Sequence, residues 1–453
     1  MRIAFLFLIM IIFMVYIGQM VATASPKLVL VLIGGLVLSM LTIMNLEWGL
    51  YILIFVIPFT MQVHLGKTIE AGTDDLLLLF LIFSWLANRA RAKEDIFVST
   101  PLNWPFFLFF VSGIVSLIPL SLKFSQIGFL VGSLHLLKFF EYVFIYFIVV
   151  SCVKEFSQVK KFTVAFFINV GIVTSVQIIQ NLIGGPLQLG ITYLKHNIVR
   201  YAVGTFESNA ILGAFHCFAL SILAGFILTI RSPKIKVILT ICSIVISFTL
   251  FNTFSRSAYV GIVGGLFILA ALKEKRLFLL LLALLIMSPM FMQAPVLERV
   301  TLTVQRLKPT VELDPSAEIR IHLWRKTFEI FMRNPIFGVG YWGVRYILGT
   351  EAHSQYWAYL TEMGIVGFSI FLWLMARIFK IALWVKKNTH DNFMEGLSVG
   401  YIAGLFAVLM TCFFSESLEA FRILGPLWFM TGLVVSVRNI TLNQATQAQT
   451  PKS

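Results

Sequence analysis

Charged residues are scarce in this sequence, and their scarcity decides its class. Only 12% of its 453 residues are charged and 59% are hydrophobic, whereas soluble domains average about 25% charged residues. The mean hydropathy is +0.91. These values exclude a soluble globular protein and predict an integral membrane protein that crosses the bilayer many times.

Cysteine is also rare, and no pattern of metal ligands accompanies it. The four cysteines lie in or beside apolar runs without metal-ligand spacing: Cys152, Cys217, Cys242 and Cys412. We interpret them as small packing residues, neither bridged nor ligating. The aspartate pair Asp74-Asp75 opens an apolar run far from the arginine-rich part of the chain. The sequence therefore predicts no metal and no other cofactor.

The formal net charge is +14, which in a soluble protein favours a nucleic-acid partner. Here many basic residues lie in short loops between apolar runs, as the positive-inside rule describes for cytoplasmic loops. We therefore expect no nucleic acid, and assign to the cytoplasmic side both termini and the loops 88–93, 154–161, 231–236, 273–276 and 377–387. The opposite side then holds the loops 184–206, 252–257, 294–354 and 415–420.

The apolar runs predict helices, because lipid offers an open backbone no hydrogen-bond partners. We expect an all-α, polytopic transmembrane bundle of about 12–14 spans. The runs lie near 3–23, 28–45, 48–64, 75–89, 104–121, 127–151, 162–183, 207–230, 235–252, 257–272, 277–293, 355–378, 396–414 and 421–438. The stretches 28–64 and 75–121 leave room for a re-entrant or interfacial helix. The first run is expected to be an uncleaved span, although a cleaved signal peptide fits the same residues.

The expected organisation has four parts. Residues 1–293 hold transmembrane helices with short loops, 294–354 form one long polar loop, and 355–440 hold the last transmembrane helices. Residues 441–453 form a polar tail, which we expect to be disordered from Asn443 onward. No internal repeat is evident.

The long loop is the most polar part of the chain. Its six arginines and two histidines are Arg299, Arg306, Arg320, Arg325, Arg333, Arg345, His322 and His353. So many cations in one loop of a membrane protein favour an anionic ligand. Asp314-Pro315 marks a helix start and Asn334-Pro335 a stop, so a helix is predicted near 315–332. Arg320 and Trp324 lie on the same face of this helix.

The loop ends with a glycine-rich turn and a histidine. Gly338, Gly340 and Gly343 predict a turn that directs the chain back to the membrane, and their spacing does not fit a dinucleotide-binding loop. His353 and Ser354 then open the next apolar helix. At a helix N-terminus the macrodipole disfavours an imidazolium, so His353 is expected to be neutral near pH 7 and able to accept a proton.

These residues resemble the shared core of the bacterial O-antigen ligase and O-antigen polymerase family. The stretches that carry the resemblance fall roughly within residues 195–375, and are Arg200 to Asn209, Phe254 to Ala258, Arg320 with Trp324, Arg333 to Gly340, and Ala352 to Gly367. The family more often has asparagine after the histidine, where this chain has Ser354.

The resemblance implies a GT-C-like, all-helical glycosyltransferase that needs no metal. Its donor would be a glycan on undecaprenyl diphosphate, used at the periplasmic face of the bacterial inner membrane. Its acceptor would be lipid A–core or another lipid-linked glycan, and membrane lipids would surround it. The periplasmic face is then the side that holds the long loop.

The resemblance also implies roles for individual residues. The catalytic residues would be His353, as the base, and Arg320. The diphosphate would be bound by Arg200, Arg256 and Arg320, because arginine carries a permanent charge and forked donors. Contacts to the acceptor or to the sugars are expected from Ser354, Tyr356, Trp324 and Asn209.

Other interpretations stay open. An O-antigen or exopolysaccharide polymerase uses the same donor chemistry, and a protein O-oligosaccharyltransferase differs in its acceptor. A lipid-linked glycan flippase or transporter would line a path with intramembrane charges, for which the candidates are Lys138, Glu141, Glu207, Arg256 and Glu362.

Two further groups of charges have simpler interpretations. The remaining arginines of 294–354 are expected to face solvent or lipid headgroups. Glu416 and Glu419 lie with Arg422 in the last loop, where they either form an ion pair or bind sugar hydroxyls.

Overall fold

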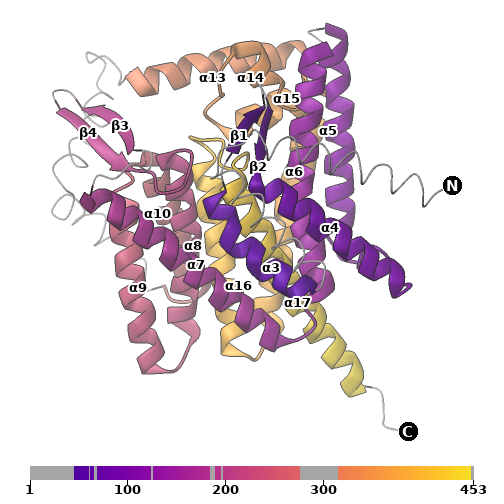
Figure 1. Cartoon of the computed structure of the whole chain (residues 1–453), viewed down its shortest axis with the longest axis vertical. Coiled ribbons are helices and arrows are strands. Elements are labelled where there is room, and N and C mark those ends of the chain that lie inside the picture. The colour runs from indigo at the N-terminus through magenta and orange to yellow at the C-terminus, as the bar shows by residue number, and fades with distance from the viewer. Residues whose placement is uncertain are drawn as a thin grey trace, which may run out of the picture.

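The computed structural model describes residues 45–60, 62–65, 69–123, 126–183, 189–194, 197–275 and 315–449. These residues form a bundle of helices with two small hairpins (Figure 1). The helices are α3 (Leu46–Val56), the 3-10 turn η1 (Ile57–Phe59), α4 (Thr73–Arg91), α5 (Asn103–Lys123), α6 (Gln126–Cys152), α7 (Phe156–Ile183), α8 (Asn209–Thr229), α9 (Pro233–Phe251), α10 (Arg256–Leu272), α13 (Pro315–Arg333), α14 (Gly343–Leu348), α15 (Gln355–Asn388), α16 (Asn392–Thr411) and α17 (Phe421–Gln449).

The strands form two antiparallel pairs outside the helical core. β1 (Gln62–Leu65) pairs with β2 (Ile69–Gly72), with Gln62 opposite Gly72. β3 (Leu189–Leu194) pairs with β4 (Asn197–Ala202), with Leu189 opposite Ala202.

Within the described residues, eight helices are long and apolar enough to cross a membrane: α5, α6, α7, α8, α9, α15, α16 and α17. The helices α3 with η1, and α10, are shorter apolar helices. The prediction of a polytopic helical membrane bundle is thus confirmed. The spans predicted near 3–23, 28–45 and 277–293 lie outside the described residues. The span predicted at 48–64 is helical only to Phe59 and then enters β1, and each of the remaining predicted spans overlaps a helix.

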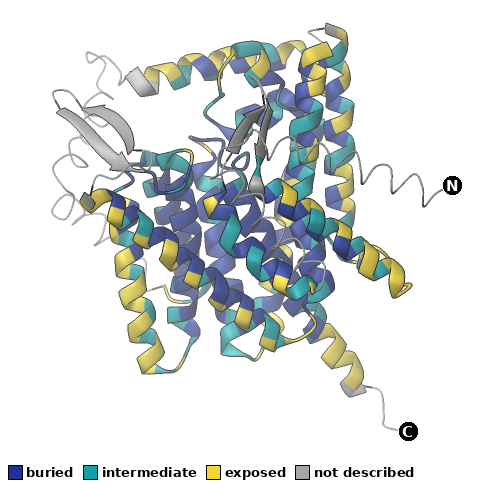
Figure 2. Cartoon of the chain, in the orientation of Figure 1, coloured by how far each residue is buried: buried dark blue, intermediate teal, exposed yellow. Residues whose placement is uncertain are grey.

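The bundle has an inner and an outer part (Figure 2). α17 and α8 are largely buried, at 89% and 78% of their most apolar window, whereas α9 is only 17% buried and presents its apolar side chains outward. Small residues let the inner helices approach closely, as is common in membranes. A Cβ on Gly225 of α8 would lie 2.5 Å from the Cα of Gly400 of α16.

Polar side chains fix the helix starts that surround the later site. Ser208 caps α8 by accepting a hydrogen bond from the Ile211 amide, and Ser255 caps α10 in the same way from Ala258. The Asn209 amide donates to the Thr253 carbonyl over 3.0 Å. The starts of α8 and α10 therefore lie side by side.

α15 is broken at Gly364, whose φ is 67° and ψ −173°. Segment 335–340 fills the break and exchanges backbone hydrogen bonds with 361–366: Val339 donates to Thr361, Gly340 to Glu362, Ile365 to Pro335 and Val366 to Ile336. The glycine-rich turn thus satisfies the amides that the break would leave open. The span predicted at 355–378 has this break within it and continues to Asn388.

α13 and α14 lie together at one end of the bundle, and the C-terminal end of α17 lies at the other (Figure 1). α13 covers Pro315–Arg333, where the sequence predicts a helix near 315–332. α17 continues as a helix to Gln449, so the expectation of disorder from Asn443 is wrong up to that residue. Arg299 and Arg306 lie outside the described residues.

We predict that Gly364→Ala destabilises the fold far more than Gly349→Ala. Both glycines have a left-handed backbone, with φ of 67° and 69°. A Cβ on Gly364 would lie 2.2 Å from the Ile336 carbonyl oxygen, whereas nothing lies within 4 Å of one on Gly349. Gly349→Ala should therefore cost only the backbone penalty of about 1–2 kcal/mol. Thermal unfolding in detergent measures both, and equal losses would contradict the role of the close approach.

Candidate functional site

A cavity of about 790 Å³ opens where α8, α13, α14 and the last loop meet. Its polar lining consists of His135, Glu207, Ser208, Asn209, Arg320, Arg345, Glu351, His353, Ser415, Glu416 and Glu419. Its aromatic lining consists of Trp342, Tyr346, Phe414 and Phe421. Residues from six separate parts of the sequence thus reach one space.

Three of the residues expected from the sequence line this cavity. Arg320 comes from α13, Asn209 from the start of α8, and His353 from the segment before α15. Arg200 lies in β4, with its backbone opposite Ile191, and its side chain is outside what the structure describes. The structure therefore brings the predicted catalytic pair, His353 and Arg320, to the same cavity.

His353 is held in an unusual backbone conformation. Its φ is 54°, and the helix α15 begins two residues later, with Ser354 at the N-cap position. Left-handed backbone in a residue with a Cβ costs about 1–3 kcal/mol and gathers at functional sites. The ring is partly exposed, and its Nδ1 lies 3.8 Å from Glu351 Oε2.

The surroundings of His353 favour its neutral form. Partial burial lowers the pKa of the imidazole below 6.5; Glu351 opposes this shift, and the positive charges of Arg320 and Arg345 add to it. A neutral imidazole at pH 7 has one ring nitrogen free to accept a proton.

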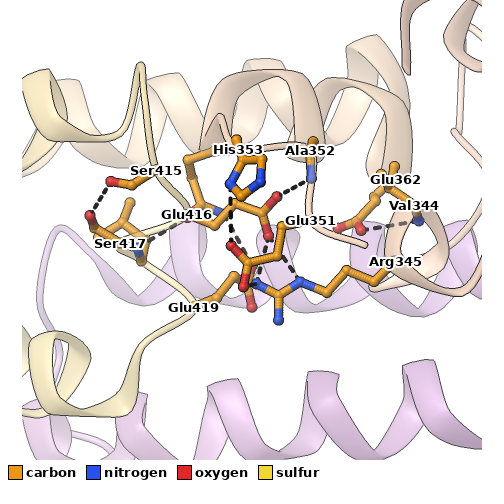
Figure 3. A network of polar contacts seen from close by, with 12 residues as sticks. Val344, Arg345, Glu351, Ala352, His353, Glu362, Ser415, Glu416, Ser417 and Glu419 are labelled. Atoms are coloured by element: carbon orange, nitrogen blue, oxygen red, sulfur yellow. Dashed lines mark hydrogen bonds and ion pairs between the residues drawn. The ribbon is translucent and has the colours of Figure 1, made fainter. Parts of the chain in front are cut away.

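An ion pair joins α14 to the last loop. Arg345 donates to Glu416 Oε2 through Nε at 3.0 Å and Nη2 at 2.7 Å, and Nη2 lies 3.1 Å from Glu351. The other oxygen of Glu416 accepts from the Ala352 amide at 2.6 Å (Figure 3). Burial opposes the charge of Arg345, but Glu416 and Glu351 outweigh it and raise the pKa of the guanidinium. Arg345 therefore stays positively charged, and Glu416 and Glu351 balance its charge locally.

Trp342 holds Arg345 from the other side. Its φ is 65°, and its ring stacks on His135 of α6 with centroids 3.7 Å apart. The Arg345 guanidinium lies 4.0 Å from the same ring, a favourable cation–π distance. Both His135 and Arg345 pack on the Trp342 ring. Trp342 therefore positions Arg345 and does not serve as an open stacking surface for a sugar.

Glu419 lies in the same loop as Glu416 and contacts uncharged groups. Tyr341 donates its hydroxyl to both carboxylate oxygens, at 3.0 and 3.2 Å, and Gln355 Nε2 donates to Oε1 at 3.1 Å. Burial raises the pKa of Glu419 to about 7, with Arg345 lowering it and Glu416 raising it. The carboxyl group is therefore close to half ionised near neutral pH.

The other expected residues are not among those that line the cavity. Arg256 begins α10, beside its cap Ser255. Ser354 is buried at the N-cap of α15. The Tyr356 hydroxyl donates to the Leu409 carbonyl at 2.8 Å, and the Trp324 indole nitrogen is buried with no partner among the described residues.

The sequence did not identify Arg345 as a residue of the site, nor the residues with which Arg345 and Arg422 form ion pairs. The expectation that it faces solvent or headgroups is wrong, because it lies in the cavity with its side chain 22% exposed. Arg422 pairs with Glu207 at 2.6 Å instead of with the glutamates of its own loop. The sequence feature that could have indicated these pairs is the two acidic residues, Glu416 and Glu419, in an outer loop of a chain poor in charge.

Among the described residues, no group of three or more histidine, cysteine or acidic side chains is arranged to hold a metal ion.

The family model of the O-antigen ligase matches residues 241–372. This segment is similar to the O-antigen ligase family. This confirms the resemblance to the O-antigen ligase and polymerase family over a segment that holds Arg256, Arg320, Arg345 and His353. Glu416, Glu419 and the predicted residues before 241 lie outside the match.

Other comparisons add little to the O-antigen ligase match. No curated protein matches the chain. A solved structure described as "Structural coordination of polymerization and crosslinking by a peptidoglycan synthase complex" is 14% identical, with 75% of this chain and 98% of that chain covered at a TM-score of 0.43. This likeness is too low to bear on function.

We predict strong energetic coupling between Arg345 and Glu416. Arg345→Met leaves the Glu416 carboxylate buried without its counter-charge, which typically costs about 3–5 kcal/mol. The double variant Arg345→Met with Glu416→Gln should recover part of that loss, because no buried carboxylate is then left without its counter-charge. Thermal unfolding of the single and double variants measures the coupling. Arg325→Met, on the exposed face of α13, is the control, and additive losses would show that the pair is not coupled.

Proposed function

We propose that the protein is a metal-independent glycosyltransferase of the bacterial inner membrane, of the O-antigen ligase type. It moves a glycan from undecaprenyl diphosphate to an acceptor hydroxyl, with lipid A–core as the acceptor. The site faces the periplasm, and both termini are cytoplasmic. The observation that carries this proposal is that Arg320 and His353 line one cavity and both fall within the O-antigen ligase match.

The arginines stabilise the negative charge of the leaving diphosphate in the proposed reaction. In the proposed reaction the acceptor oxygen attacks the anomeric carbon, the bond from that carbon to the diphosphate breaks, and the lipid diphosphate leaves with the electron pair. Arg320 binds the developing charge, together with Arg200 in β4 and Arg256 at the start of α10. Removing one contact of this kind typically costs about 10²–10³ in rate. Arg345 supports the same field, although Glu416 and Glu351 compensate its charge.

His353 takes the proton of the attacking hydroxyl. Its lowered pKa keeps the ring neutral at pH 7, which a general base needs before it can act. Its left-handed backbone and the Ala352 amide bond to Glu416 hold it at the wall of the cavity. Asn209 also lines the cavity and contacts a sugar in the proposed reaction, whereas Ser354 and Tyr356 lie at the start of α15 and Trp324 lies on α13 with Arg320.

The polymerase alternative shares the donor half of this site and differs in the acceptor. The flippase alternative has less support. Three of the five charges that could line a path have partners instead: Lys138 pairs with Asp75 at 2.9 Å and Glu207 with Arg422 at 2.6 Å, and Glu362 accepts from the Val344 amide.

We predict that His353→Ala and Arg320→Ala reduce glycan transfer by at least about 100-fold, and that Arg200→Ala and Arg256→Ala weaken it. Membrane insertion should be unchanged, because His353, Arg320 and Arg256 are not part of the buried core. Transfer is measured with purified protein and undecaprenyl-diphosphate-linked glycan, and Glu329→Gln on the exposed face of α13 is the control. Transfer at the wild-type rate by all four variants would overturn the proposal, and donor binding without any product would favour the flippase.

The surface glycans of a deletion strain separate the two acceptors. Loss of polymer from lipid A, with lipid-linked polymer accumulating, is the result expected for a ligase. Products that carry a single repeat unit would instead identify a polymerase. Gel analysis of extracted glycans makes the distinction.

We predict that kcat falls with decreasing pH along a limb whose midpoint lies below 6.5, the ordinary pKa of histidine. The direction follows from the base: protonation of His353 removes its accepting nitrogen, and its lowered pKa moves that loss to lower pH. The measurement is kcat at saturating donor and acceptor between pH 5 and 8. A midpoint above 6.5 would contradict His353 as the base in these surroundings.

A further inference from the structure

The four carboxylates that line the cavity differ in whether a cation forms an ion pair with them. Three of its four carboxylates are ion-paired: Glu207 with Arg422 at 2.6 Å, Glu416 with Arg345 at 2.7 Å, and Glu351 with Arg345 at 3.1 Å. In the part of the chain that the structure describes, the hydrogen bonds of Glu419 come from the neutral Tyr341 and Gln355. Glu419 therefore differs from the other three in having no cation bonded to it there.

The partners of Glu419 fix its orientation. Tyr341 and Gln355 are both fully buried, and the Gln355 side-chain oxygen accepts from the Leu418 amide at 3.0 Å, which holds the amide group in one orientation. Glu419 itself is half-buried and lines the cavity. A carboxylate has about four lone-pair sites, so the three donor contacts that Glu419 receives leave capacity for a further donor.

We infer that Glu419 is the acceptor-binding carboxylate of this cavity, and that it takes the hydroxyl groups of an uncharged sugar. A carboxylate is a strong acceptor for sugar hydroxyls, since hydrogen bonds to a charged group are shorter and stronger than neutral ones. The inference rests on the proposed function, because it requires that an acceptor sugar enters the cavity.

The charge of the lining explains why the sugar is uncharged. Four carboxylates and two guanidinium groups line the cavity, and the cations serve the donor diphosphate in the proposed reaction. A phosphate or carboxylate carried on the acceptor sugar would lie against Glu419, and like charges placed together in an interface are strongly unfavourable. The lining thus selects against an acidic acceptor sugar without contacting its reactive hydroxyl.

Titration of Glu419 makes this selection depend on pH. The groups facing it are Arg345 on α14, Glu416 in its own loop, Tyr341, and Gln355, Tyr359 and Glu362 on α15. Burial brings the pKa of Glu419 to about 7. Its negative charge is therefore complete above that pH and is lost below it, so repulsion of an acidic acceptor grows as pH rises from 6 to 8.

The test uses the full-length purified protein, an undecaprenyl-diphosphate-linked glycan, and two matched glycolipid acceptors. One acceptor ends in an uncharged hexose, and the other ends in the matching hexuronic acid, whose carboxylate stays ionised from pH 6 to 8. Glu419→Gln keeps an oxygen that accepts from Tyr341, so it preserves the fold while removing the charge. Glu329→Gln, on the exposed face of α13, is the matched control.

We expect Glu419→Gln to raise the acceptor KM for the neutral hexose about tenfold, with kcat within about threefold and the donor KM unchanged. The wild-type preference for the neutral acceptor should be at least about tenfold and greater at pH 8 than at pH 6. In Glu419→Gln the preference should narrow and lose its dependence on pH, which a purely structural role of Glu419 would not produce.

The failures of the two proposals are distinguishable. If the wild-type protein transfers no glycan to either acceptor, the proposed function fails. If the wild type transfers and Glu419→Gln keeps its acceptor KM and preference, the acceptor role of Glu419 is wrong. A collapse of kcat with an unchanged acceptor KM overturns it too, because that result assigns Glu419 to the chemical step.

Discussion

The buried carboxylate of Glu416 is the contact on which the site depends. It lies in the loop between α16 and α17 and binds both the Arg345 guanidinium and the Ala352 amide. Those two groups flank the turn that leads to His353. Because a buried charge is tolerated only when it is paired and hydrogen-bonded, this one carboxylate holds α14, the left-handed backbone of His353 and the last loop in a single arrangement.

The break in α15 anchors the backbone segment that leads to the cavity. Segment 335–340 pairs with 361–366 across the break, and the Tyr341 amide then donates to Ser116 of α5 at 3.1 Å. The turn is therefore anchored to two helices before it delivers Trp342 and Arg345 to the cavity. The cavity gains rigidity in this way, since its loop residues are positioned by buried helices instead of by solvent-exposed turns.

Arginines and glutamates both line the cavity, so its ligand does not follow from positive charge alone. Arginines alone would favour any anion. With carboxylates beside them, most of the positive charge is neutralised locally, so a substrate is recognised by the placement of individual groups. In the proposed function, Arg320 and His353 would serve the diphosphate, and Glu419, held by neutral donors, would serve the sugar within the same cavity.

The sequence by itself determined the helical bundle, because apolar runs near membrane thickness have no other stable form in lipid. It also determined the start of α13, through Asp314-Pro315, and the pairing of Arg320 with His353 as candidates, through a local motif. It did not indicate the break at Gly364, since glycine is frequent in membrane helices, nor the place of Arg345. The partner of Arg345 is Glu416, 71 residues away. Which of several loop arginines meets a given carboxylate depends on how distant helices pack, and only the tertiary structure decided that.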